Sequence, residues 1–173
     1  VITYRMAENW VEYTDYIVGY NFDTGEVVDI PTKPANNEIW YRAETDIKPN
    51  LAAPIEFNMD LGCFVATFSG AVQEIEDNAF SNISGELTGV ILPDCVTSIG
   101  DYAFANCTSL ISIVIPDSVT KLGSGVFYGC SKLSSVTLSK NLTSIPSSAF
   151  GNCTNLRTST ITIPEGITYI GNG

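Results

Sequence analysis

Apolar residues recur with a fixed period along the second half of the chain. Three stretches, AFANCTSL, VFYGCSKL and AFGNCTNL, begin 23 residues apart. Their apolar positions form three columns: Phe104, Phe127 and Phe150; Cys107, Cys130 and Cys153; and Leu110, Leu133 and Leu156. Three registers at one period predict a repeat protein in which each unit packs on its neighbours, with these nine residues as the inward structural ladder.

One unit, residues 110–130, predicts three short elements. LISIVIP alternates apolar and polar positions and ends at a proline, which is typical of a strand. VTKLG suits a second, shorter extended piece before a glycine. SGVFYGC spaces its apolar residues as one helical or 3₁₀ turn facing the core.

Weaker copies flank the three clear units. Upstream, Ala79 and Phe80 keep the pattern, and Ile83 stands at the cysteine position. Downstream, IPEGITYIGNG begins another unit that stops at Gly173. We therefore predict a β-rich solenoid over residues 67–173, with stacked parallel strands, short helical or 3₁₀ turns, and about four units, the last incomplete.

The first half of the chain is irregular and acidic. Residues 1–91 hold 15 acidic and four basic residues, whereas residues 92–173 hold four of each. We predict that residues 1–66 form a small β-rich N-terminal cap, because the first repeat needs its open apolar end shielded. Within it, IWYRAE alternates as a strand, and Asp-Thr-Gly in NFDTGEVVD predicts a hairpin turn.

Charge and hydropathy argue against nucleic-acid binding and against a membrane-spanning segment. The net charge of −11 opposes binding to phosphate backbones, so we expect no nucleic-acid partner. No stretch approaches the ~18 consecutive apolar residues of a membrane span, and we expect no transmembrane segment in this chain.

The repeats resemble those of BspA-like bacterial leucine-rich repeat surface proteins. IPDSVTKLGSGVFYGCSKLSSVTL and LPDCVTSIGDYAFANCTSLISIVI carry the resemblance, while the third unit departs from it with Ser139 for a proline and Pro146 for a glycine. NEIWYRAETD resembles a segment preceding such repeats in secreted Bacteroidetes proteins, and PIEFNMDLGCFVATFSG looks like the strand pair that leads into the first unit.

The resemblance implies a leucine-rich repeat solenoid that is exported and is either displayed at a cell surface, with a lipid anchor as one mode of attachment, or secreted. The first residue is Val1 rather than Met, which we interpret as a mature or excised segment. The implied function is a binding or adhesion module whose partners are host or bacterial surface proteins.

The five cysteines show no catalytic or metal-binding pattern. The chain lacks histidine and any CxxC pair, so the usual zinc ligand sets and a Cys-His catalytic pair are excluded. Stacked cysteines ~4.8 Å apart could form a disulfide, but we predict buried free thiols. A bridge between Cys63 and Cys95 stays open. We expect no enzyme activity and no cofactor or metal.

The outer side of the strands is the candidate binding face. It comprises Ser112, Val114, Ser135, Thr137, Thr160 and Thr162, short side chains that lie between the inward apolar positions. They offer hydrogen-bonding groups on a flat surface, although such residues are equally good strand formers facing water.

Two further functions are compatible with the sequence. Aromatic residues of the first half could bind glycans, as a carbohydrate-binding or carbohydrate-processing accessory protein would, or could equally form the core of the cap. They are Trp10, Tyr13, Tyr16, Tyr20, Trp40 and Tyr41. The chain could also be a structural spacer within a longer surface protein. The four Asn-x-Ser/Thr sequences, at Asn82, Asn106, Asn141 and Asn152, are interpreted as turn residues.

Overall fold

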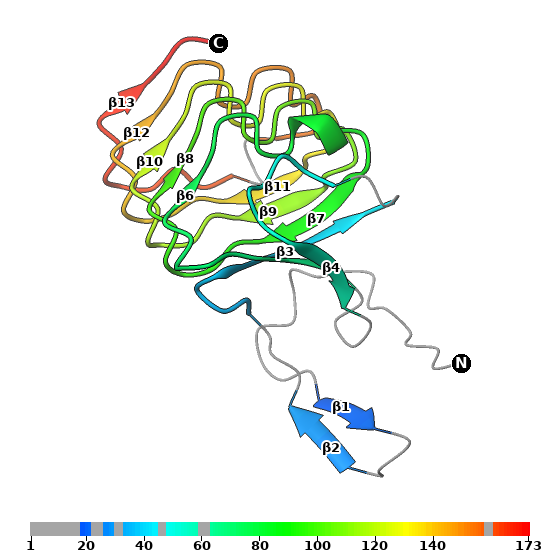
Figure 1. Ribbon diagram of the computed structural model, residues 1–173. Helices are drawn as coiled ribbons and strands as arrows, with labels where there is room; N and C mark the ends of the chain where they lie inside the picture. The colour runs from blue at the N-terminus through cyan, green and yellow to red at the C-terminus, as the bar shows by residue number, and fades with distance from the viewer. Residues whose placement is uncertain (1–17, 22–25, 30–32, 45–47, 59–62, 158–160) are drawn as a thin grey trace.

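The computed structural model describes residues 18–21, 26–29, 33–44, 48–58, 63–157 and 161–173 (Figure 1). Its only helix in these residues is the 3₁₀ helix η1 (Ser81–Ile83). The strands are β1 (Val18–Asn21), β2 (Glu26–Asp29), β3 (Glu38–Ala43), β4 (Ile55–Asn58), β5 (Cys63–Thr67), β6 (Glu74–Ile75), β7 (Leu87–Ile91), β8 (Ser98–Ile99), β9 (Ser112–Val114), β10 (Lys121–Leu122), β11 (Ser135–Thr137), β12 (Ser144–Ile145) and β13 (Tyr169–Ile170).

The repeats stack through two separate sets of parallel strands (Figure 1). In one set, β9 pairs with β11, so that Ser112 lies beside Ser135 and Val114 beside Thr137. In the other, the two-residue strands β6, β8 and β10 pair in order, and β12 pairs with β13. Both kinds of strand were expected from the unit pattern, and two units contribute one strand to each set, with β8 and β9 in one and β10 and β11 in the next.

The third side of each unit is a hydrogen-bonded turn, and here the expectation of a helical or 3₁₀ turn is wrong for the units that follow η1. Left-handed residues interrupt any helix: Tyr102, Gly125 and Ser148 lie at one position of the unit, and Asn106, Gly129 and Asn152 at another, with φ between 54° and 76°. Between these positions the backbone N–H groups donate to the next unit, as from Phe104 to Val126 (2.9 Å). The turns therefore hold neighbouring units together as the strands do.

The turn of the third unit keeps its shape despite the two departures from the repeat pattern. Ser139 is fully buried where other units have proline. Its hydroxyl donates to the Val119 carbonyl (2.6 Å) and accepts from the Asn141 N–H (3.1 Å). At Pro146, the carbonyl accepts a turn hydrogen bond from Ala149 (3.3 Å). At Ser139, side-chain hydrogen bonds thus replace the conformational restriction that proline supplies in the other units.

The first half of the chain joins the repeats through one antiparallel sheet of order β4-β5-β3-β7. The expected strand pair of PIEFNMDLGCFVATFSG is β4 and β5, with Phe57 opposite Phe64. β3 pairs with β5 on one side and on the other with β7, which lies one unit before β9. The flanks of the expected hairpin, β1 and β2, also pair antiparallel. The division at residues 66 and 67 remains a prediction.

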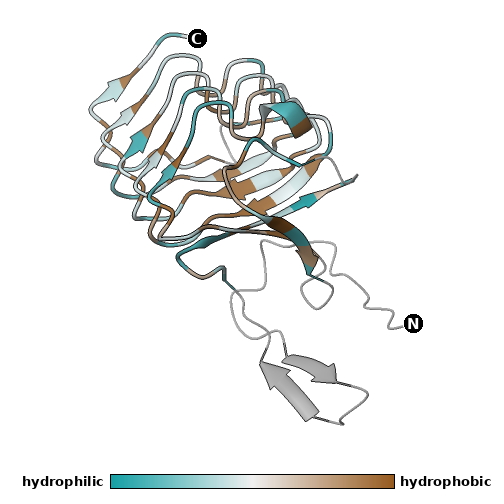
Figure 2. Ribbon diagram, viewed as in Figure 1, coloured by the Kyte–Doolittle hydropathy of each residue, from teal (hydrophilic) through white to brown (hydrophobic). Residues whose placement is uncertain are grey.

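One continuous apolar core runs from this sheet through the stacked units (Figure 2). It includes Ile39 and Tyr41 of β3 together with the inward residues of every unit as far as Cys153. Because the sheet and the repeats share this core, the sheet covers apolar side chains of the first unit that would otherwise meet water.

Candidate functional site

The predicted binding face follows the outer side of β9 and β11. Val114 and Thr137 are exposed and adjacent, while Ser112 and Ser135 are adjacent and half-buried. A bridge between Val136 and Ile161 brings the next unit alongside β11, and Thr162 is exposed there. Thr160 lies outside the described residues. The face therefore presents two regular rows of short side chains across neighbouring units.

The face is more apolar than its hydroxyl groups indicate. Val114 is 45% exposed, and Ile111, at the entrance to β9, is 57% exposed. The sequence interpretation did not include Ile111, because a strictly alternating strand would turn it inward. Exposed apolar side chains that lie close together are typical of protein-binding surfaces.

The Trp40 and Tyr41 side chains of β3 do not form a sugar-binding platform. The glycan hypothesis is therefore wrong for these two residues. Trp40 is 4% exposed and Tyr41 is fully buried. The Trp40 indole N–H donates to the Glu38 carboxylate (3.0 Å), and Tyr41 belongs to the core. Trp10, Tyr13 and Tyr16 lie outside the described residues, and so does the side chain of Tyr20.

The phenylalanine column forms a continuous stack of rings. Phe80, Phe104, Phe127 and Phe150 are stacked with centroid separations of 4.9, 5.5 and 5.6 Å. Tyr41 of β3 meets Phe80 edge-on at 6.1 Å and stacks on Phe64 at 5.2 Å. Phe104 and Phe127 are fully buried, whereas Phe150 is half-buried. This stack continues from the N-terminal sheet into the repeats.

The cysteine and leucine columns also point inward. Cys107, Cys130, Leu110 and Leu133 are fully buried, Cys153 is 9% exposed, and Leu156 is half-buried. All five cysteines lie within the described residues and are free thiols, so neither the stacked pairs nor Cys63 and Cys95 are bridged in this structure.

The thiols take part in hydrogen bonds that the sequence interpretation did not anticipate. Cys130 Sγ donates to the Phe104 carbonyl and Cys153 Sγ to the Phe127 carbonyl, each at 3.0 Å and each one unit back. Cys95 Sγ lies 3.1 Å from the Asn36 carbonyl and 3.2 Å from that of Val72, at the junction with the first half. The column thiols therefore act as small apolar groups that also hold neighbouring units in register.

The thiols are poor nucleophiles in this setting. The neighbouring Cys107 thiol and burial raise the pKa of Cys130 to about 12. Cys130 and burial likewise raise the pKa of Cys153, and burial raises that of Cys63 to about 11. Because the thiolate is the reactive form, these cysteines are neutral and unreactive at physiological pH.

Replacement of Cys130 by alanine is expected to lower the free energy of unfolding by about 1–3 kcal/mol, since a buried side chain and its hydrogen bond are lost. Urea unfolding monitored by circular dichroism at pH 7 measures this. A fully folded variant with unchanged stability would contradict the packing role of the column.

The stability lost in Cys130→Ala is also expected to depend on pH. The folded pKa of Cys130 is raised from 9.0 to about 12, so burial of the neutral thiol contributes its full stability below pH 9 and loses it as the pH rises toward 12. The stability difference between wild type and Cys130→Ala should therefore shrink from pH 8 to pH 10.5.

Side chains outside the ladder add further bonds between units. Thr97, Thr120 and Thr168 donate hydroxyl hydrogen bonds to carbonyls of the preceding unit, at Gln73, Thr97 and Thr143. The Asp77 and Asp101 carboxylates accept backbone N–H groups of Asp101 (2.6 Å) and Ser124 (2.7 Å) in the following unit. In the sequence, the threonine after the β-branched residue at Val96, Val119 and Ile167 carried part of this signal, and these hydroxyl and acidic groups serve the stack.

The sequence-predicted turn asparagines occupy structural positions. Asn106 and Asn152 are left-handed, which asparagine tolerates better than most residues. The side-chain amides of Asn82 and Asn141 donate to the carbonyls of Lys48 (2.6 Å) and Asp117 (2.7 Å).

Two further properties concern only the part of the chain that the structure describes. In it, no cluster of three or more Cys, Asp or Glu side chains is arranged to hold a metal ion. None of its helices has the length and hydrophobicity needed to cross a bilayer.

These features define a leucine-rich repeat protein, and sequence comparison identifies its class. The sequence model of the BspA type leucine rich repeat region matches residues 67–173 in six copies. The chain belongs to this family. No curated protein sequence matches the chain.

Three solved structures are similar to this chain. The T. pallidum leucine rich repeat protein TpLRR is 32% identical with a TM-score of 0.53, over 57% of this chain and 45% of that one. A leucine rich cell surface protein from Faecalibacterium prausnitzii A2-165 is 27% identical with a TM-score of 0.45, over 73% of this chain and 30% of that one. A leucine-rich repeat protein from Bacteroides ovatus ATCC 8483 is 29% identical with a TM-score of 0.43, over 58% and 31%. The chain thus spans less than half the length of these proteins.

Proposed function

We propose that this chain is a protein-binding module of an exported bacterial surface protein, and that it binds other surface or matrix proteins in adhesion. Membership of the BspA-type repeat family supports this assignment. In the proposal the units form a solenoid, and residues 1–66 cap its first unit. A source in Bacteroidetes, as the resemblance implies, belongs to the same proposal.

The observation that carries the proposal is the composition of the outer face of β9 and β11. It aligns Ser112 with Ser135 and Val114 with Thr137 in parallel register, and Ile111 adds a 57% exposed apolar side chain. Short side chains lose little conformational entropy when a partner covers them. Parallel pairing also fixes their spacing, so the face is preorganised for binding.

The test introduces arginine on this face. We expect the double variant Ser135→Arg and Thr137→Arg to bind at least about tenfold more weakly to any member of a panel of matrix proteins that the wild type binds, because two long charged side chains obstruct the flat surface. Surface plasmon resonance with immobilised matrix proteins measures the loss.

The matched control is the double variant Thr143→Arg and Ser144→Arg. It changes one exposed threonine and one half-buried serine, as the test variant does, and it adds the same charge. These residues lie at β12, in the other strand set. The control is expected to bind like wild type. If both variants bind like wild type, the outer face of β9 and β11 is not the binding surface.

A further inference from the structure

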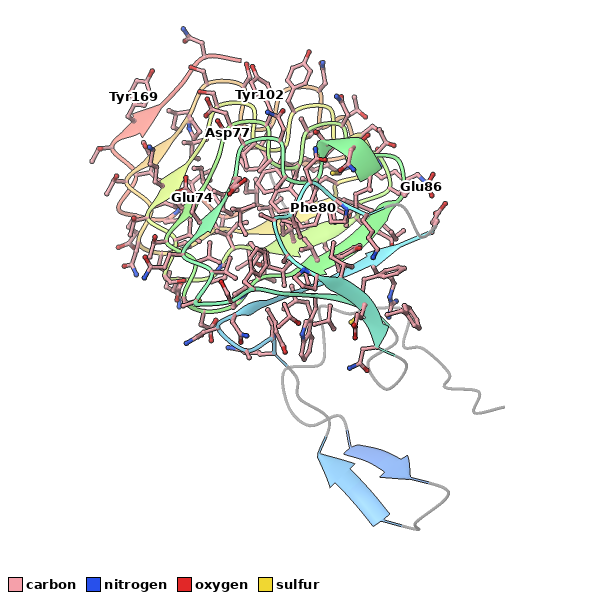
Figure 3. The ribbon with its side chains drawn as sticks, viewed as in Figure 1. Glu74, Asp77, Phe80, Glu86, Tyr102 and Tyr169 are labelled. Atoms are coloured by element: carbon pink, nitrogen blue, oxygen red, sulfur yellow. The ribbon has the colours of Figure 1, made fainter. Side chains whose placement is uncertain are left out.

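A second surface of the molecule carries exposed tyrosines that the fold does not require. Tyr102 is 44% exposed and Tyr128 is 37% exposed, both on the turn side of the repeats, away from the outer face of β9 and β11. Figure 3 shows Tyr102 at the outer edge formed by the turns, whereas Phe80 lies in the interior. We name Tyr102 and Tyr128 the tyrosine pair.

Each ring of the tyrosine pair is held over a glycine of the following unit. A Cβ atom added to Gly125 would lie 3.0 Å from Cζ of Tyr102, and closer still to other atoms of that ring. A Cβ atom added to Gly151 would lie 2.9 Å from Cδ2 of Tyr128. The Tyr128 hydroxyl also accepts a hydrogen bond from the Asn152 amide (2.8 Å). Contacts within the protein thus position both rings, while much of their surface stays in water.

The two tyrosines belong to one local surface. Tyr102 covers Gly125, and the backbone N–H of Tyr128 donates to the carbonyl of that same glycine (2.9 Å). The backbone N–H of Asn106 in turn donates to the Tyr128 carbonyl. Exposed amide side chains of Asn106 and Asn152 accompany the rings.

Tyr102 adopts a backbone conformation that tyrosine disfavours. Its φ is 54°, in the left-handed region, where a bulky side chain is unusual and costs stability. The equivalent residues of the other units are Asn78, Gly125 and Ser148, which are smaller. Contact with Gly125 positions the Tyr102 ring but leaves the residue 44% exposed at a strained backbone position, and this favours a role for the free surface of the ring.

We propose that the tyrosine pair is a binding site for neutral glycans. Aromatic faces pack against the apolar C–H faces of pyranose rings, and the amides of Asn106 and Asn152 offer donors and acceptors to sugar hydroxyls. The tyrosine pair lies in residues 92–173, which hold four acidic and four basic residues, so this region has no excess of positive charge with which to bind sulfated or carboxylated polysaccharides. The site is separate from the proposed protein-binding face and does not depend on it.

Two substitutions test the site with residues that the chain itself uses at equivalent positions. Tyr102→Asn installs the residue found at Asn78, and Tyr128→Ala installs the residue found at Ala105. The control, Tyr169→Ala, removes a tyrosine that is 59% exposed in β13, in the other strand set.

The measurement is affinity electrophoresis of the whole chain in native gels containing xyloglucan, mixed-linkage β-glucan, galactomannan or dextran sulfate. We expect at least one of the three neutral polysaccharides to retard the wild type and Tyr169→Ala. Each pair variant should raise the dissociation constant about tenfold or more. Loss of retardation in Tyr102→Asn and Tyr128→Ala alone would support the site.

Nitration by tetranitromethane gives a second measurement that needs no variant. Mass spectrometry should show that the retarding polysaccharide protects Tyr102 and Tyr128 but leaves Tyr169 reactive. The proposal is overturned if no neutral polysaccharide retards the protein, if dextran sulfate alone does so, if both variants bind like wild type, or if the two tyrosines are not protected.

Discussion

Replacement of Phe127 by alanine is expected to lower the free energy of unfolding by about 3–5 kcal/mol. Phe127 is fully buried and stacks between Phe104 and Phe150, at 5.5 and 5.6 Å. Its removal leaves a cavity between two rigid neighbouring units and breaks the ring stack at both sides. Because the stack holds consecutive units together, the loss should appear in the main unfolding transition. Urea unfolding followed by circular dichroism measures it.

Phe150→Ala is the matched control for this prediction. It removes the same side chain from the same position of the next unit, but Phe150 is half-buried and stacks on one described neighbour, Phe127. The cost should be about half that of Phe127→Ala, since both the buried area and the ring contacts are smaller. Equal losses in the two variants would show that stacking between units is not what stabilises the column.

Replacement of Tyr41 by alanine is expected to destabilise the protein by a similar amount, about 3–5 kcal/mol, although Tyr41 lies outside the repeats. It is fully buried, stacks on Phe64 at 5.2 Å and meets Phe80 of the first unit edge-on at 6.1 Å. The cavity would therefore open where the N-terminal sheet joins the stacked units. Denaturant unfolding should show one transition with a lower midpoint.

Phe57→Ala separates burial from ring contact in this region. Phe57 also meets Phe64 at 5.2 Å, but it is 55% exposed at β4. The expected loss is below about 1 kcal/mol, because little apolar area leaves the core. A large loss in Phe57→Ala with a small one in Tyr41→Ala would contradict the role given to the junction.

The repeat was predictable from the sequence because its spacing is the direct consequence of stacking. Residues that must meet the same neighbour in every unit recur at one interval, and Phe104, Phe127 and Phe150 do so. The two kinds of strand followed from this pattern, whereas the family was indicated by the resemblance of the unit sequences to BspA-type repeats.

The turns were not predictable, because the hydropathy pattern does not determine which residues adopt a left-handed backbone conformation. Val126, Phe127 and Cys130 have helical spacing, yet Gly125 and Gly129 are left-handed and direct their N–H groups to the next unit. In the first unit, Asn82 stands at the second of these positions without a left-handed φ, and only that described unit has a 3₁₀ helix.

The candidate surfaces were predictable only in part. Alternation placed Val114 and Thr137 outward, but it missed the exposed Ile111 just before β9. The glycan hypothesis needed Trp40 and Tyr41 as exposed rings, but both are buried. Because neighbouring residues of a strand point to opposite faces of its sheet, both faces of β3 are covered at these positions. The two exposed tyrosines of the repeats gave no periodic signal, since each occurs at its position in one unit.

The hydrogen bonds between units have a consequence for how such a chain can change in length. Those of the turns, threonines and cysteines join residues about one period apart, such as Phe127 to Ala149, Thr120 to Thr97 and Cys153 to Phe127. A duplicated unit inserted between two others would meet the same kinds of neighbour on both sides. Whole-unit duplication and deletion are therefore inexpensive evolutionary steps for this architecture. The turns also accommodate a small change in unit length, since Phe80 and Phe104 stack at 24-residue spacing and Ile145 pairs with Ile170 at 25-residue spacing.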